Sequence, residues 1–160
     1  MKSQTKEKAI CTKHIDSILN NQESQMHNLI KGLLKEGIKK SKSKKKKVAA
    51  VLLDDCGLIH NEAQFNIPLD LMPKFEENKN TNHVLSIYCW KQELKKRAET
   101  KNKEFYAHAE LMLLYKYIFD HKDRNVDLTG YCMFITHEPC QVCLKYIRHF
   151  KMHYRVMNCE

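Results

Sequence analysis

Two short fragments with metal-binding residue types constrain the fold of this chain more than any other feature. The first carries His108 and Glu110 two residues apart, and the second carries Pro139, Cys140 and Cys143. Each fragment stands where the pattern of apolar residues predicts that a helix begins. Cys140 and Cys143 are three residues apart, so they share one face of the first helical turn. Because one imidazole and two thiolates are zinc ligands, we expect a fold in which these two helix starts meet.

The expected ligand set has three members, which points to a catalytic rather than a structural zinc ion. Three protein ligands leave the fourth tetrahedral position open to water, whereas a structural site needs a fourth protein ligand. Residues that offer such a ligand occur at Cys132, His137, His149 and Cys159. In the catalytic interpretation, zinc lowers the pKa of water and Glu110 is the proton shuttle. The order H-x-E…P-C-x-x-C is the signature of zinc-dependent nucleobase deaminases, so we expect Zn²⁺ to be bound by His108, Cys140 and Cys143.

A run rich in lysine divides the chain into two segments. Residues 1–47 are predicted to form an N-terminal helix, with apolar residues three and four apart as far as Ile38, and then a lysine-rich linker. Gly37 is the expected stop of this helix. The lysine run over residues 39–47 is compatible with a solvated linker, a nuclear-import signal or a tether that binds phosphate. Residues 48–160 are expected to form the zinc deaminase domain.

The second segment alternates strand and helix patterns. An apolar run over residues 48–53, a turn at residues 54–57 and a return strand that begins at Leu58 predict a β-hairpin. After an irregular stretch over residues 68–82, the pattern predicts a helix over residues 84–97. A helix, a strand, a helix and a strand are then predicted in order, over residues 107–119, 131–136, 139–150 and 154–157. This order favours an α/β fold, namely a three-layer α-β-α sandwich with a central mixed sheet.

The segment from His108 to Val156, together with the hairpin, resembles the cytidine/deoxycytidylate deaminase superfamily. Within it, Glu138-Pro139-Cys140 is similar to the tRNA adenosine deaminase and guanine deaminase branches. Residues 128–140 are especially similar to eukaryotic tRNA wobble-adenosine deaminases, which are heterodimers that convert adenosine to inosine in the anticodon. The resemblance implies a cytidine deaminase-like fold, a zinc cofactor, tRNA as substrate and a second deaminase subunit as partner.

Two parts of this resemblance point to different subunits of that heterodimer. Residues 128–140 are similar to the partner subunit, which keeps the zinc ligands but has typically lost the catalytic glutamate. Residues 108–112 resemble the catalytic subunit instead, and Glu110 is present. We interpret the retained carboxylate beside intact ligands as a competent active site, with a non-catalytic scaffold role as the alternative.

The chain departs from the family pattern in three places. The segment between the hairpin and His108 is longer than is usual in the family. The asparagine that holds the substrate sugar, just after the second strand, has Asn66 as its candidate. The sequence reaches Glu160 soon after the fourth predicted strand, where the family fold has a fifth strand, so a shortened C-terminal end is expected. An unpaired sheet edge favours association, which agrees with a partner subunit.

Charged and aromatic residues near the motifs are compatible with a nucleic-acid partner. The formal net charge of +9 favours an anionic partner. Two basic groups suit either contacts with RNA phosphates or solvated faces: Lys95, Lys96, Arg97, Lys101 and Lys103, and Lys145, Arg148, Lys151 and Arg155. Four aromatic residues are candidates for stacking on a flipped base, or else belong to the core: Phe105, Tyr106, Tyr131 and Tyr146.

Composition bounds the compartment and the class of protein. No apolar run among the 160 residues is long enough to cross a bilayer, and no apolar signal core follows the N-terminus. Seven cysteines in such a chain favour a reducing compartment, so we expect a cytoplasmic and/or nuclear protein without a membrane partner. The expected function is zinc-dependent hydrolytic deamination of adenosine to inosine at the tRNA wobble position, as a subunit of a heterodimer. The alternatives are a free nucleotide deaminase of the deoxycytidylate type and a non-catalytic zinc-binding partner subunit.

Overall fold

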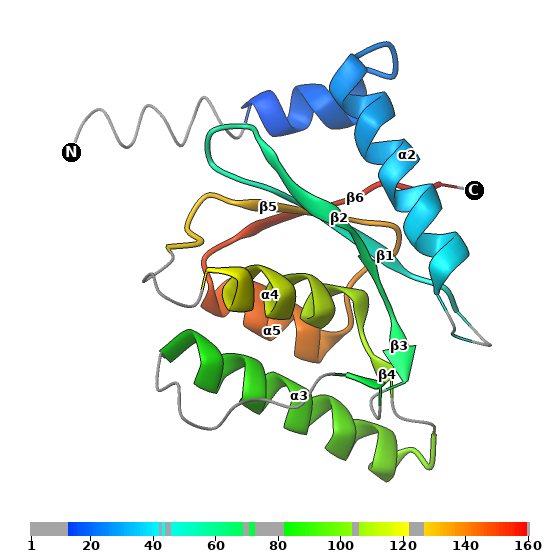
Figure 1. The fold of residues 1–160 in the computed structure, drawn as a ribbon, viewed down its shortest axis with the longest axis vertical. Coiled ribbons are helices and arrows are strands. Elements are labelled where there is room, and N and C mark those ends of the chain that lie inside the picture. The colour runs from blue at the N-terminus through cyan, green and yellow to red at the C-terminus, as the bar shows by residue number, and fades with distance from the viewer. Residues whose placement is uncertain are drawn as a thin grey trace.

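The computed structural model describes residues 13–41, 43, 46–68, 71–72, 82–103, 106–121 and 127–159. Residues 13–20 form a helix that precedes the labelled elements. The labelled elements follow in Figure 1 as α2 (Gln25–Lys40), β1 (Ala49–Leu53), β2 (Ile59–Phe65), β3 (Ile67–Pro68), α3 (Asn82–Thr100), β4 (Tyr106–Ala107), α4 (Ala109–Asp120), β5 (Cys132–Ile135), α5 (Gln141–His149) and β6 (His153–Val156). In the described part of the chain, no helix has the length and apolar character needed to cross a membrane.

A mixed four-stranded sheet forms the centre of the fold, with the strand order β2-β1-β5-β6. β1 is antiparallel to both β2 and β5, and β5 is parallel to β6. α2 lies on one face of this sheet, α4 and α5 cover the other face, and α3 packs outside α4 and α5 (Figure 1). The predicted three-layer α-β-α sandwich with a central mixed sheet is therefore confirmed, and α3 adds a further layer.

Strand β1 shows why the centre of the sheet is wholly apolar. All five of its residues are buried. Ala49, Val51 and Leu53 pack with the core on the α2 side, whereas Ala50 and Leu52 pack with the core on the α4 and α5 side. Because helices cover both faces of the strand, polar side chains are disfavoured on either face. The continuous apolar run that predicted this strand follows from that double burial.

The turn between β1 and β2 has the conformation that its residues predict. Gly57 has a φ of 86°, in the left-handed region that residues with a side chain rarely adopt. Asp54 Oδ1 accepts hydrogen bonds from the backbone N–H groups of Cys56 and Leu58, at 2.8 and 2.9 Å. Asp54 Oδ2 lies 2.7 Å from Nε2 of His60 in β2. The predicted β-hairpin is therefore confirmed.

The N-terminal helix differs from the prediction in its continuity and in its end. The helical stretch over residues 13–20 stops, and α2 begins after Ser24, whose Oγ accepts a hydrogen bond from the N–H of His27 at 3.3 Å. The prediction that Gly37 ends the helix was wrong, because α2 continues beyond it. A Cβ on Gly37 would lie 2.7 Å from the Cβ of Ala49 in β1. The absent side chain is what allows the helix to lie directly on the sheet.

The long segment between β2 and β4 packs on the outside of the sandwich. The predicted helix over residues 84–97 is observed as α3, and most of the predicted irregular stretch lies outside the described residues. Trp90 of α3 is fully buried and stacks on Tyr146 of α5, with ring centroids 5.3 Å apart and planes 4° apart. β3 and β4, at the two ends of the segment, pair antiparallel. The segment is therefore anchored at its base and along its helix.

Candidate metal centre

Three side chains with metal-ligand atoms meet where α4 and α5 begin. His108 and Cys140 are the N-cap residues of these helices, and Cys143 lies in the first turn of α5. His108 Nδ1 lies 3.6 Å from Cys140 Sγ and 3.4 Å from Cys143 Sγ. Cys140 Sγ also accepts a hydrogen bond from the backbone N–H of Cys143, at 3.4 Å. The structure thus brings together the three residues that the sequence predicted as ligands.

The spacing of these three atoms fits a tetrahedral zinc ion. With Zn–S bonds of about 2.3 Å and a Zn–N bond of about 2.0 Å, tetrahedral angles place a nitrogen and a sulfur ligand about 3.5 Å apart. The observed distances of 3.4 and 3.6 Å lie on either side of this value. Among the residues that the structure describes, no fourth histidine, cysteine or carboxylate joins the cluster. The donor set therefore fits zinc with one coordination position left for water.

The residues considered as a fourth protein ligand lie elsewhere. Cys132 and Cys159 belong to the core on the α2 side of the sheet. His149 Nε2 lies 3.1 Å from the hydroxyl oxygen of Ser86, and His137 Nδ1 lies 2.8 Å from the hydroxyl oxygen of the preceding threonine. This arrangement favours the three-ligand, catalytic type of site over a structural one.

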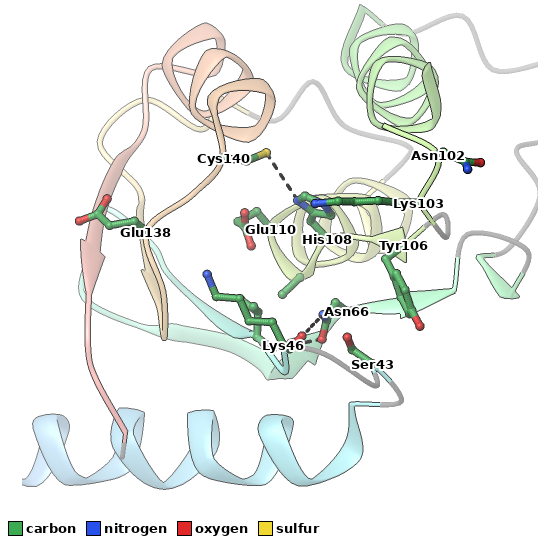
Figure 2. Close-up of a pocket in the computed structure, with 12 residues that line it drawn as sticks. Ser43, Lys46, Asn66, Asn102, Lys103, Tyr106, His108, Glu110, Glu138 and Cys140 are labelled. Carbon is green, nitrogen blue, oxygen red and sulfur yellow. Dashed lines mark hydrogen bonds between the residues drawn. The ribbon is translucent and has the colours of Figure 1, made fainter. Parts of the chain in front are cut away.

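Glu110 stands beside the cluster in the first turn of α4 and is 3% exposed. Burial raises the pKa of its carboxyl group, while attraction to His108 and a hydrogen bond with Cys143 lower the pKa by less. Figure 2 shows Glu110, His108 and Cys140 gathered in one group. A buried carboxyl group with a raised pKa is suited to accept and release a proton near neutral pH.

The two cysteines of the cluster differ in their ease of ionisation. A hydrogen bond from the thiol of Cys143 is the largest of several effects that lower the pKa of Cys140 to about 3, although burial opposes them. Burial raises the pKa of Cys143 well above its ordinary value. Burial lowers the pKa of His108, but the hydrogen bond with Cys140 and attraction to Glu110 outweigh it, so that pKa is raised. Cys140 is the N-cap residue of α5, where the helix dipole also favours an anion.

A cleft of about 440 Å³ opens over the cluster, within the range of small-molecule sites. His108, Glu110 and Cys140 line it (Figure 2). Two segments that are far apart in the sequence provide much of the remaining wall: one supplies Ser43, Lys46 and Val48, and the other supplies Asn102, Lys103 and Tyr106. The lysine run and the long segment before β4 therefore both reach the candidate site.

Ser43 and Lys46 were not expected at the site, because the lysine run was interpreted as a linker, an import signal or a tether. One signal could have placed them there. The run leads directly into the first buried strand, and β1 pairs with β5, the strand that precedes Cys140. A segment that enters the sheet next to β5 must pass close to the residues that follow β5.

Asn66, the candidate for holding a substrate sugar, follows β2 and lines the cleft. Its side chain is also engaged within the protein. Asn66 Nδ2 donates a hydrogen bond to the carbonyl oxygen of Lys46 at 2.7 Å, and Asn66 Oδ1 accepts one from the N–H of Val48 at 3.1 Å. The hydroxyl of Ser41 donates a further bond to Oδ1. The amide of Asn66 therefore holds the end of the lysine run against the sheet.

The aromatic candidates separate into one cleft residue and two packing residues. Tyr106 lines the cleft, and Phe105 lies outside the described residues. Tyr131 precedes β5, at the end opposite to Cys140, and its hydroxyl lies 3.0 Å from that of Tyr117. Tyr146 is buried against Trp90. Of the two interpretations, core packing therefore holds for Tyr131 and Tyr146.

The predicted basic groups also separate by position. Lys103 lines the cleft, and Arg97 is close enough to His108 to contribute to its electrostatic environment. In the second group, Lys145 forms an ion pair of 2.7 Å with a glutamate of α3, and Arg155 forms one of 3.0 Å with Asp16. Contact with RNA phosphates stays a prediction for both groups.

Sequence comparison agrees with the geometry of the cluster. A sequence model of the cytidine and deoxycytidylate deaminase zinc-binding region matches residues 21–159. A search of curated proteins finds no significant match. The matched segment contains the whole mixed sheet, helices α2 to α5, and the cluster where α4 and α5 begin. This is expected for a cytidine deaminase-like fold with zinc as its metal. The chain therefore belongs to the cytidine and deoxycytidylate deaminase zinc-binding family.

Proposed function

We propose that this protein is a catalytic zinc-dependent deaminase that converts adenosine to inosine at the wobble position of tRNA. The observation that carries a catalytic role is the placement of Glu110. Its carboxyl group is buried, stands beside the His108, Cys140 and Cys143 cluster, and lines the cleft. A subunit that only bound zinc would have no need of a buried carboxyl group at this position, where burial is costly.

The chemistry follows from the positions of these side chains. His108, Cys140 and Cys143 would hold zinc, which when bound makes a water molecule nucleophilic near neutral pH. Glu110 would accept one proton from that water and deliver it to the ring nitrogen, and would then carry the remaining proton of the newly added hydroxyl to the departing amino group. A carbon–oxygen bond forms at the amino-bearing ring carbon, the carbon–nitrogen bond breaks, and ammonia leaves. Tyr106 lines the cleft and is the aromatic candidate there for contact with the base.

Three features support tRNA as the substrate and a second deaminase subunit as partner. The triplet Glu138-Pro139-Cys140 is similar to the tRNA adenosine deaminase and guanine deaminase branches, and the net charge is +9. The outer edge of β6 pairs with no other strand among those described, and an open sheet edge suits a partner protein. A free nucleotide of the deoxycytidylate type is the second candidate substrate, because the matching family includes enzymes of that type.

The test is inosine formation at the tRNA wobble position in a lysate depleted of this protein. The lysate is restored with wild type or with Glu110→Gln, which preserves the shape of the side chain but cannot shuttle a proton. Rescue by wild type alone supports the proposal. Rescue by both proteins would assign a scaffold role, and unchanged inosine after depletion would exclude the tRNA function and make free nucleotides the next substrates to assay.

A further inference from the structure

Two lysines line the cleft from separate segments of the chain. Lys46 comes from the segment before β1, and Lys103 comes from the turn after α3. Figure 2 shows Lys46 extending into the cleft below Glu110 and Lys103 reaching toward His108. Neither ammonium group has an ion-pair partner within the described residues. The cleft therefore has two positive charges that no acidic side chain of the described residues neutralises by ion pairing.

Hydrogen bonds fix the backbone that carries Lys46, although its ammonium group has no ion-pair partner in the described part of the chain. The carbonyl oxygen of Lys46 accepts the 2.7 Å bond from Asn66 Nδ2, and the N–H of Val48 donates the 3.1 Å bond to Asn66 Oδ1. The backbone N–H of Asn66 donates in turn to the carbonyl oxygen of Val48 at 3.2 Å. Because the backbone is already held in this way, ligand binding has to order only the side chain of Lys46.

Lys103 is placed in the cleft by the end of α3. Asn102 has a φ of 51°, in the left-handed region, and the N–H of Lys103 donates to the carbonyl oxygen of Ala98 at 2.9 Å. This hydrogen bond closes the helix and turns the chain toward β4 and His108. The stacked Trp90 and Tyr146 fix α3 on α5. The long segment between β2 and β4 thus ends by presenting a cation next to the zinc ligands.

Among the acidic residues, Glu110 and Glu138 also line the cleft. Glu110 is buried, and Figure 2 shows the carboxylate of Glu138 directed away from Lys46 and Lys103. Of the two carboxylates, that of Glu138 therefore does not face an anion held by the two lysines, whereas Glu110 lies between them in Figure 2. On a nucleoside that places its base at the candidate metal centre, the anionic group nearest the base is a phosphate attached to the sugar.

We propose that Lys46 and Lys103 together bind phosphate attached to the nucleoside whose base enters the cleft. The substrate is then phosphorylated, as part of an RNA strand or as a free nucleotide, rather than a neutral nucleoside or base. Asn66 is a positioning residue for Lys46. This inference rests on the proposed function, because the deaminase reaction is what places a nucleoside in the cleft.

The test compares Lys46→Gln/Lys103→Gln with a control that loses the same charge nearby, Lys47→Gln/Lys101→Gln. Neither control residue lines the cleft. The probes are a fluorescent anticodon-loop oligoribonucleotide, the 5′-monophosphates of adenosine and deoxycytidine, and the two unphosphorylated nucleosides. Dissociation constants are measured over a range of salt concentrations, and product formation is measured in parallel.

Each exposed lysine is expected to strengthen phosphate binding about threefold. The cleft variant, which lacks both lysines, should therefore bind the phosphorylated substrate probe about tenfold more weakly. The slope of log affinity against log salt should fall by about one for each lysine. The control should change affinity less than twofold, and nucleoside binding should be unchanged. A loss confined to the oligoribonucleotide identifies an RNA strand as the source of the phosphate, and a loss for a monophosphate identifies a free nucleotide.

The inference is overturned if the cleft variant and the control bind every phosphorylated probe alike. It is also overturned if wild type binds the nucleosides as tightly as the phosphorylated probes. If the lysine contrast appears but wild type and Glu110→Gln restore inosine formation equally in the depleted lysate, phosphate recognition is supported and the proposed catalytic function fails.

Discussion

Replacing Gly37 by alanine tests the closest contact between a helix and the sheet. The added Cβ would lie 2.7 Å from the Cβ of Ala49 and 3.1 Å from the Cβ of Ala63. Carbon atoms pack best at about 3.5–4.0 Å, so α2 or the sheet must move by about 1 Å. Gly32 is the matched control, because it lies in the same helix, is exposed, and a Cβ there would meet nothing within 4 Å.

The two substitutions share one contribution and differ in another. Alanine in place of glycine within a helix stabilises it by about 0.5–1 kcal/mol, and this gain applies to both variants. Overpacking a close contact costs about 1–3 kcal/mol, and this cost applies to Gly37→Ala alone. We therefore expect Gly32→Ala to be more stable than wild type, and Gly37→Ala to be about 1–3 kcal/mol less stable than Gly32→Ala. In a domain of this size the difference corresponds to at least about 2 °C in Tm.

The assay is urea unfolding with zinc held at one concentration, followed by circular dichroism and by the fluorescence of Trp90, the only tryptophan in the chain. The dependence of the free energy of unfolding on urea should be equal for the two variants, so that midpoints can be compared. A Gly37→Ala protein as stable as Gly32→Ala would refute the close seating of α2 on β1.

Three further perturbations probe the site and its surroundings. Cys143→Ala should lose bound zinc and lower Tm, as should a chelator added to wild type, and metal analysis with thermal melts would reveal a variant that keeps its zinc. Tyr131→Phe removes the 3.0 Å bond to the hydroxyl of Tyr117 and should cost about 1 kcal/mol in urea unfolding, whereas no loss would mean that the bond does not stabilise the fold. Burial works to raise the pKa of Asp54, but hydrogen bonds from Leu58 and with His60 hold it below 3.8. Its stabilising contribution is therefore present above that pH and lost as the pH falls further, so Asp54→Asn should be less stable at pH 7 and approach wild type in acid. A stability difference that stays constant with pH would contradict this assignment.

The parts of the fold that could be predicted from the sequence are those encoded by local signals. The apolar run of β1 reflects burial on both faces, and the turn at Gly57 needs a left-handed residue. His108, Cys140 and Cys143 could be predicted as a set because each lies at the start of a helix. The spacing of three residues places Cys140 and Cys143 on one face of their helix.

What could not be predicted depends on contacts between distant residues. Glycine often ends a helix, so Gly37 was predicted to end this one. Only the close approach of β1 explains why a glycine lies inside α2. Tyr146 lies near the cysteine motif in sequence, yet Trp90, from a different helix, determines that its ring is packed rather than open. Lys46 and Lys103 belong to separate polar segments, and no local pattern indicates that both line one cleft.

The pairing of β1 with β5 has a consequence for the order of events during folding. The N–H of Ala49 bonds to the side chain of Thr136, which is 87 residues later in the chain. The β1–β2 hairpin closes locally, whereas β5 can join it only after the long segment that contains α3 has been brought back to the sheet. Closing such a loop slows folding, because its entropic cost precedes the gain from the contacts. We therefore expect the ligand set to assemble late, since Cys140 and Cys143 arrive only with the strand that precedes them.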